Sequence, residues 1–289
     1  MQTFKQVIQS ATQNKVALGH FNISNLEGLW GIFNAAKSLN LPIVIGVSEG
    51  ERDFIGVKQT RDLITSLRQQ YDYPIFLNAD HTYTLERIKE VVELGYDSVI
   101  FDGAKLPMEE NIQKTKEVVD YVKSINPDIL VEAEVGYIGS SSKMLDELPE
   151  GATASEEAMP TGQEVKDFVQ QTGVDLISPA VGNIHGMLKN AANPELNIDR
   201  IKEISEAAGV PLVLHGGSGI KDDNFTQAIQ AGISMIHINT EIRKAWAEAL
   251  RKYLQENPDE VAPYKIMTDS VAAVQTVVTD RLKLFNHLS

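Results

Sequence analysis

Short apolar runs rich in β-branched residues alternate along the chain with longer stretches whose apolar positions recur at helical spacing. Such runs are typical of strands buried on both faces, and their alternation with amphipathic helices is typical of repeated parallel βα units. About eight units are expected, the number that closes a (β/α)8 TIM barrel. The pattern therefore predicts an α/β fold with a single TIM-barrel domain over residues 1–289. Its strands are expected at Val16–Asn22, Ile43–Ser48, Ile75–Asp80, Ser98–Asp102, Ile129–Glu134, Leu176–Val181, Leu212–His215 and Met235–Asn239.

Two segments depart from this alternation. The stretch Gly139–Met159 is rich in Ser, Glu, Gly and Ala and is too long and polar for a tight connection, so we interpret it as a mobile loop and a candidate lid. The stretch Ala262–Leu284 follows the eighth unit and predicts an extra C-terminal helix or helix pair. Other connecting segments have ordinary helical patterns, for example Thr84–Leu94 and Glu109–Ser124.

Composition narrows the chemistry. The chain has no cysteine, which excludes disulfides, thiol catalysis and Cys-type zinc sites, and leaves six histidines and the carboxylates as ligands for a transition metal. A net charge of -14 argues against nucleic acid and anionic membranes as partners, so any phosphate must be recognised locally. The first residues lack the apolar core of a signal peptide, and no stretch approaches the roughly 18 apolar residues of a membrane span. These features predict a cytoplasmic protein.

Polar residues interrupt the apolar strands at or just beyond their carboxyl ends. In a barrel these ends converge on one face, so residues far apart in the sequence become neighbours around a single mouth. The residues concerned are Asp80-His81, Asp102, Glu132, Glu134, His185, His215-Gly216-Gly217-Ser218 and His237-Ile238-Asn239-Thr240.

Three of these histidines, His81, His185 and His215, follow different strands of the same rim. Any one alone is a satisfied polar residue at the start of a loop, but together they suit a catalytic Zn²⁺ site with one position open for substrate. Glu134 is open to three interpretations: a fourth ligand, a partner that orients a histidine, or a solvated carboxylate. We assign His20 and His287 to structure or surface.

The segment Gly216–Gly219 (GGSG) offers unobstructed backbone N–H groups directly before a helix, and Asn239-Thr240 precedes the next helix. Loops after the seventh and eighth strands are the recurrent phosphate site of TIM barrels. This position predicts a local anion site in an otherwise acidic protein.

Eight stretches spread over nearly the whole chain form a specific set of motifs: FNISNLEG at Phe21–Gly28, PIVIGVSEG at Pro42–Gly50, ADH at Ala79–His81, GYDSVIFDGA at Gly95–Ala104, VEAEVG at Val131–Gly136, GNIHGMLK at Gly182–Lys189, LVLHGGSGI at Leu212–Ile220 and INTEIRKAW at Ile238–Trp246. In composition and order they resemble the class II fructose- and tagatose-bisphosphate aldolases. The resemblance implies a metal-dependent lyase that acts on a phosphorylated ketose, forms dihydroxyacetone phosphate and assembles as a homodimer or homotetramer. It also implies one catalytic Zn²⁺ and allows a second divalent or monovalent cation.

Roles follow from the resemblance at matching positions. His81, His185 and His215 match the zinc ligands, and Glu134 matches a position that binds metal in some members. Asp80 matches the acid/base that exchanges a proton with the C4 hydroxyl, and Asp102 matches a carboxylate near the metal. Positions around the substrate, most of them at the phosphate on its ketone half, are matched by Asn22, Ser48, Gly186, Lys189, Gly216, Gly217, Ser218, Asn239 and Thr240.

The chain departs from the family pattern at four places. Asn78 stands where the family has a histidine two residues before the catalytic Asp, and Met235 and His237 replace the usual Lys and Asn of the last strand. We expect His237 to bind substrate, with acid/base, metal-binding and packing roles left open. The loop after Glu134 lacks the usual Gly-Gly and early acidic residues, and Lys265 stands where an Asp-Pro-Arg motif carries a distal-phosphate Arg.

The leading hypothesis is reversible cleavage of fructose 1,6-bisphosphate to dihydroxyacetone phosphate and glyceraldehyde 3-phosphate. Two alternatives stay open. One is an aldolase for tagatose bisphosphate or another ketose (mono)phosphate, because the departures concern the aldehyde half. The other is a non-catalytic homologue that binds metal and sugar phosphate.

Overall fold

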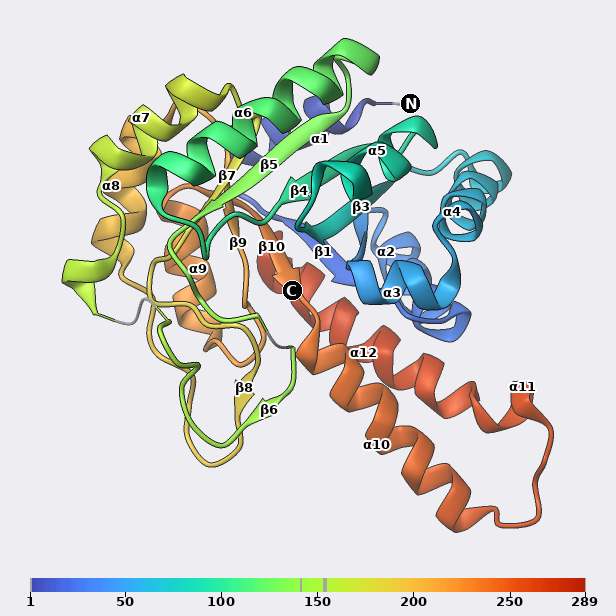
Figure 1. Ribbon diagram of the computed structural model, residues 1–289. Helices are drawn as coiled ribbons and strands as arrows, with labels where there is room; N and C mark the ends of the chain where they lie inside the picture. The colour runs from blue at the N-terminus through green and yellow to red at the C-terminus, as the bar shows by residue number, and fades with distance from the viewer. Residues whose placement is uncertain (1, 141, 153–154, 289) are drawn as a thin grey trace.

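The computed structural model describes residues 2–140, 142–152 and 155–288. Eight parallel strands close into a barrel in the order β1-β10-β9-β7-β5-β4-β3-β2, and helices surround it (Figure 1). The TIM-barrel prediction is confirmed. The barrel strands are β1 (Leu18–Asn22), β2 (Ile43–Val47), β3 (Ile75–Thr82), β4 (Ser98–Phe101), β5 (Leu130–Val135), β7 (Leu176–Pro179), β9 (Leu212–Leu214) and β10 (Ile233–Ile238).

The helices begin and end at recognisable sequence signals. Thr84 caps α5 by accepting a hydrogen bond from the Arg87 N–H, and Thr161 forms a capping box with Glu164 at the start of α7. The helices are α1 (Phe4–Asn14), α2 (Leu26–Leu39), α3 (Glu49–Ile55), α4 (Val57–Tyr71), α5 (Leu85–Glu93), α6 (Met108–Ile125), α7 (Gly162–Thr172), α8 (Ile198–Ala208), α9 (Asp222–Ala231), α10 (Thr240–Glu256), α11 (Pro263–Ile266) and α12 (Thr268–Phe285).

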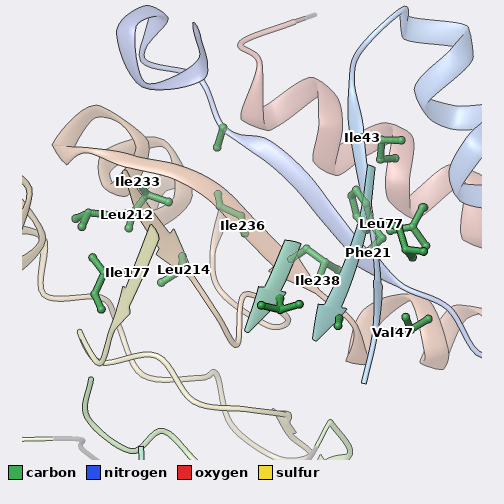
Figure 2. Close-up of a cluster of buried hydrophobic side chains, with 14 of the residues drawn as sticks. Phe21, Ile43, Val47, Leu77, Ile177, Leu212, Leu214, Ile233, Ile236 and Ile238 are labelled. Atoms are coloured by element: carbon green, nitrogen blue, oxygen red, sulfur yellow. The ribbon is translucent and has the colours of Figure 1, made fainter. Parts of the chain in front are cut away.

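Alternate residues of each strand face opposite sides of the barrel wall, as the pleat requires. One set points outward and packs against the helices, where Ile43, Val47, Leu77 and Ile238 lie in one continuous core (Figure 2). The outward residues pack in this core and inward residues at the base are also apolar, so the strands appear in the sequence as nearly continuous apolar runs.

The inward-facing set changes character from the bottom of the barrel to its mouth. The lowest layer is apolar and packs on Phe4, Val7 and Ile8 of α1, which closes the amino-terminal end of the barrel. Two residues further along, the inward positions are polar on all of these strands except β2, which has Gly46 there. The apolar layer comprises Leu18, Val44, Phe76, Leu130, Leu176, Val213 and Met235, and the polar layer includes His20, Asn78, Glu132, His215 and His237.

Two additions complete the barrel. The predicted C-terminal helices are α11 and α12, and α12 packs along α2 and α10 while the far ends of α10 and α12 project from the barrel (Figure 1). Within the expected lid, β6 (Met144–Leu145) pairs with β8 (Met187–Leu188), and η1 (Glu156–Ala158) follows. The described part of this loop is therefore joined to the loop that carries His185. Over the described residues no helix is long and apolar enough to cross a membrane.

Gly46 provides a test of the packing inside the barrel. A Cβ at Gly46 would lie 2.1 Å from Cε1 of the buried His20. We expect Gly46→Ala to lower the free energy of unfolding by about 1–3 kcal/mol through overpacking, measured by urea denaturation. Gly50→Ala on α3 is the matched control because nothing lies within 4 Å of its Cβ position, and it should be neutral or slightly stabilising. Equal losses in both variants would contradict the packing argument.

Candidate active site

Asp80 and His81 are adjacent in β3, yet both line the same cavity at the mouth. Neighbouring strand residues normally point to opposite faces. The pairing of β3 with β4 shifts register between Ala79 and Thr82, and His81 has φ 35°, a conformation that non-glycine residues rarely adopt. This irregularity turns His81 toward the mouth beside Asp80. Backbone strain at such a position is typical of functional sites.

The structure brings His81, His185 and His215 together with Glu134. One ligand atom from each lies within 4.8 Å of the others. The three imidazole planes are nearly perpendicular to one another, at 71°, 83° and 75°, so their in-plane lone pairs can converge on one point.

The chemistry of these donors fits a cation. His185 Nε2, His215 Nδ1 and Glu134 Oε1 are buried, and none has a well-aligned hydrogen-bond partner among the described residues, although His215 Nδ1 and Glu134 Oε1 lie 3.1 Å apart. Buried polar atoms without a well-aligned partner are costly, and a metal ion would satisfy all three at once. Neutral imidazole and carboxylate donors suit Zn²⁺ and similar divalent ions.

Carboxylates behind the cluster orient its rings. Glu132 Oε1 lies 2.7 Å from His215 Nε2, and Asp102 Oδ2 lies 3.0 Å from His81 Nδ1. Carboxylates in this position fix the tautomer and direction of metal-binding histidines. Asp102, which matches a family carboxylate near the metal, lies where it can orient His81. The equivalent contact of Glu132, which lies fully inside the barrel, was not assigned from the sequence.

His237 differs from the three clustered histidines in the direction of its ring. It stacks on His215 at 4.0 Å and 23°, and on His20 at 3.4 Å and 5°. Parallel rings point their nitrogens along parallel planes, so His237 cannot easily share an ion with either neighbour. Its Nδ1 lies 3.6 Å from Asp80 Oδ1, and its Nε2 has no partner among the described residues. This geometry favours substrate contact over metal binding.

The stacked rings of His20 and His237 account together for two departures from the family pattern, Asn78 and His237. His20 Nε2 lies 3.1 Å from Asn78 Oδ1, and Asn78 donates to Ser98 Oγ at 2.7 Å. Asn78 thus supports His20, which in turn supports His237. His20, assigned to structure or surface from the sequence, is fully buried and lies directly beneath the site. His287 is exposed near the C-terminus, also as expected.

Two adjoining cavities occupy the mouth. The inner cavity contains most of the predicted phosphate-site residues, and the outer cavity extends from it toward α3. The inner cavity is lined by Asn22, Asp80, His81, Ser142, His185, Gly186, Gly216, Ser218, His237, Asn239 and Thr240. The outer cavity shares Asp80, His81, Ser142, His185 and Asn239, and adds Ser48, Glu49, Gly50, Tyr83, Ser140 and Arg243.

At the inner cavity the GGSG loop meets the start of α10. The Ser218 hydroxyl accepts hydrogen bonds from the N–H groups of Asn239 and Glu241. A Cβ at Gly216 would lie 2.3 Å from the Ile184 carbonyl, so only glycine fits there. The Gly217 N–H donates to the His237 carbonyl, and Gly217 therefore shapes the loop without offering that group to a ligand.

Three residues expected near the substrate lie elsewhere or are otherwise engaged. Ser48 lines only the outer cavity, and its hydroxyl bonds Glu51 at 2.9 Å. Lys189 lines neither cavity, because its ammonium pairs with Asp146 at 2.9 Å. Lys265 on α11 pairs with Glu260 and also lines neither cavity.

Comparison with known proteins decides the family. The family model described as fructose-bisphosphate aldolase class-II matches residues 2–288. The chain belongs to this family. It is therefore an aldolase of the metal-dependent class, a carbon–carbon lyase.

Named relatives of this aldolase differ in their substrates. It is 34% identical to a 6-phospho-5-dehydro-2-deoxy-D-gluconate aldolase from Bacillus licheniformis, with 98% of this chain and 94% of the relative covered. It is 32% identical to a fructose-bisphosphate aldolase from Geobacillus stearothermophilus, covering 98% and 96%. Among solved structures, the YdjI aldolase of Escherichia coli K12 matches with a TM-score of 0.81 and 30% identity, covering 97% and 96%. Family membership thus leaves the aldehyde half of the substrate undefined.

Burial and charge shift the pKa values of the clustered groups in this aldolase. Burial lowers the pKa of His215, but the carboxylates of Glu134 and Glu132 outweigh it and raise the pKa to about 10. The pKa of His81 is also raised well above its usual value, because Asp80 and Glu134 overcome the effect of burial. Burial and the charge of His81 lower the pKa of His185 to about 3. In the metal-free protein these shifts favour the protonated forms of His81 and His215.

These shifts predict a pH dependence of metal binding. Coordination requires neutral imidazoles, so we expect Zn²⁺ to displace protons from His81 and His215 as it binds. Affinity should increase as the pH rises toward about 10, the pKa of His215, and weaken as the pH falls. Calorimetric titrations in buffers with different ionisation enthalpies measure the released protons. Zn²⁺ binding without proton release at neutral pH would contradict this picture.

Proposed function

We propose that this aldolase uses Zn²⁺, held by His81, His185 and His215 with Glu134 nearby, to cleave a ketose 1-phosphate between C3 and C4. The products are dihydroxyacetone phosphate and an aldehyde, and the reaction is reversible. The observation that carries the proposal is the convergence of the three nearly perpendicular imidazoles beside Asp80, at a cavity that His81, His185, Gly216 and Ser218 line. Fructose 1,6-bisphosphate, expected from the sequence, is one member of this substrate class.

The bound cation supplies an electrophile that stabilises negative charge developing at the ketone oxygen. Convergent donors with an open side toward the inner cavity support this assignment. A second divalent or monovalent cation remains a prediction. His20, Asp80 and His237 form another close group of donors, but the parallel rings of the two histidines are poorly placed to share an ion.

Asp80 is proposed to take the proton from the C4 hydroxyl. Its Oδ2 accepts a hydrogen bond from Asn22 at 2.8 Å, while Oδ1 is buried without a partner among the described residues. Burial would raise the pKa of Asp80, but the histidines around it, led by His81, hold that pKa well below its usual range. In the metal-free protein these histidines favour the ionised form of Asp80, and its unpartnered Oδ1 is available to accept a proton.

The electrons and protons balance without another reactant. As Asp80 removes the C4 hydroxyl proton, C4 becomes the aldehyde carbon and the electron pair of the C3–C4 bond passes toward the ketone oxygen. Protonation at C3 then completes dihydroxyacetone phosphate. Asn22 keeps the carboxylate of Asp80 oriented, and the unpartnered Nε2 of His237 is available to a substrate oxygen. Gly186, Gly216, Ser218, Asn239 and Thr240 line the cavity where the phosphate is expected.

We expect Asp80→Asn to reduce kcat by about 10²- to 10⁴-fold, because an amide cannot accept the proton. Dihydroxyacetone phosphate release in a coupled assay measures this loss, and metal analysis should show that zinc content is retained. Chelation should abolish wild-type turnover, with Zn²⁺ restoring it. If metal-replete wild-type protein released no dihydroxyacetone phosphate from any ketose phosphate, the proposal would fail, and the non-catalytic alternative would be favoured.

The oligomeric state is a separate prediction. Three large apolar side chains are exposed at the projecting end: Leu254 on α10 (45%), Val261 in the connection between α10 and α11 (83%) and Tyr264 on α11 (77%). Apolar side chains gathered on a projecting element are typical of an interface. We expect light scattering to give the mass of a homodimer or homotetramer, and Val261→Glu with Tyr264→Glu to shift it toward the monomer. A wild-type monomer at micromolar concentration would contradict this expectation.

A further inference from the structure

The outer cavity determines what the aldehyde half of the substrate can be. If the proposed function is correct, the ketone half occupies the inner cavity beside the cation. The carbons beyond C4 then extend past Asp80 into the outer cavity, because the two cavities share Asp80, His81 and Asn239. The charges that line the outer cavity therefore act directly on the end of the substrate.

Arg243 is the only lysine or arginine that lines the outer cavity in the described part of the chain. Its guanidinium is already engaged by Glu51, and it also donates to the Ser142 carbonyl at 3.4 Å. The carboxylate of Glu51 is 5% exposed, so its charge depends on this partner. Moving Arg243 to a ligand would leave a buried carboxylate without its counter-charge, which is strongly unfavourable.

Glu51 is also fixed from the other side. Its Oε2 accepts hydrogen bonds from Asn22 Nδ2 at 2.9 Å, from the Ser48 N–H at 2.8 Å and from the Ser48 hydroxyl at 2.9 Å. The first turn of α3 is thus occupied by the carboxylate of its own chain. Together these contacts hold Glu51 and Arg243 as one neutral pair at the wall of the cavity.

A second carboxylate makes this wall acidic. Glu49 lines the outer cavity and is partly exposed, and its Oε1 accepts a hydrogen bond from the Tyr83 N–H at 3.0 Å. Asp80 lies at the junction of the two cavities. Arg52 and Arg87 act on these carboxylates through space, but neither lines the outer cavity. The guanidinium of Arg52 is bonded to the Val47 and Asp80 carbonyls, and that of Arg87 to Asp53 and Glu90. Lys189 and Lys265, the other basic residues considered for phosphate, are paired with Asp146 and Glu260.

We infer that the outer cavity receives an uncharged, hydroxyl-bearing aldehyde half, so that the substrate is a ketose with one phosphate, at C1, rather than a bisphosphate. The inference rests on the proposed function and selects among its substrates. A distal phosphate would meet the carboxylates of Glu49 and Asp80 without a free cation. Sugar hydroxyls, by contrast, can donate to Glu49 and exchange hydrogen bonds with the hydroxyls of Ser140 and Ser142, which also line the cavity.

The test compares kcat/KM for fructose 1-phosphate, tagatose 1-phosphate and the two corresponding 1,6-bisphosphates, with Zn²⁺-loaded full-length protein. We expect at least one monophosphate to exceed both bisphosphates by tenfold or more. A bisphosphate that matches or exceeds the monophosphates would overturn the inference and leave the proposed function intact. Failure to cleave any of the four, or any other ketose phosphate, would instead remove the proposed function and the inference with it.

Variants that remove the charge of Glu49 or Glu51 test whether these carboxylates cause the preference for a monophosphate. Glu49→Gln keeps the size and the hydrogen-bond acceptor of the side chain, and it should raise the bisphosphate-to-monophosphate ratio of kcat/KM about fivefold, the effect of one like charge at close range. Glu51→Gln should raise the ratio further because it releases Arg243. The matched control is Glu206→Gln on α8, which removes the same charge from an exposed side chain that lines neither cavity.

The bisphosphate-to-monophosphate ratio of kcat/KM distinguishes a change in substrate specificity from a loss of stability. A variant that merely folds less well loses both activities together, whereas the inference requires the ratio to change. An unchanged ratio in Glu49→Gln and Glu51→Gln, or an equal change in Glu206→Gln, would overturn the assignment of selectivity to this wall. The circular dichroism spectrum and the midpoint of urea denaturation report that each variant is folded.

Discussion

The alternation of inward and outward side chains along eight closed strands is the constraint on which the rest of this structure depends. Because the period is two, each strand contributes an inward residue at every second position. Strand β3 shows the result in its three inward residues. Phe76 lies in the apolar layer at the base, Asn78 lies in the polar layer above it, and Asp80 lies at the mouth. The same progression from Leu130 through Glu132 to Glu134 places two carboxylates in the barrel interior. Helix α1 and the apolar layer close the base of the barrel, so the charged groups above them are shielded from water on that side.

In the described part of the chain, β3 breaks this period at the mouth, where chemistry is expected. The irregularity between Ala79 and Thr82, with His81 at positive φ, brings Asp80 and His81 onto one side of the wall. A regular strand would have separated the proposed base from the proposed metal ligand. The adjacent supports are correspondingly strong, because Arg52 is fully buried and its guanidinium donates to the Val47 and Asp80 carbonyls and to the Thr82 hydroxyl. These bonds hold the strained segment from behind.

The sequence was sufficient to predict the barrel and the convergence of His81, His185 and His215, because strand ends of a parallel barrel must meet at one face. It could not reveal how His20, Asn78 and His237 are related. They lie on three strands and contact one another through ring stacking and one hydrogen bond, which no local spacing encodes. Glu51 and Arg243 were missed for the same reason, since 192 positions separate them and neither lies in a strand. Lys189 was expected at the phosphate, but its flexible side chain pairs with Asp146.

The two halves of the mouth therefore have different physical origins. Residues around the inner cavity are held largely by the strands and by loops with little freedom, such as Gly216 and Ser218, so this half is well determined by the family motifs. The outer cavity is built from side chains on α3, α10 and the segment around Ser142, whose charges can change without disturbing the barrel. Catalysis depends on precise geometry and is suited to the rigid strands and short loops around the inner cavity. Selection among aldehydes needs only complementary charge and hydroxyl groups, which the side chains of the outer cavity can provide. Relatives named for different substrates, yet about one-third identical over nearly the whole chain, are consistent with this division.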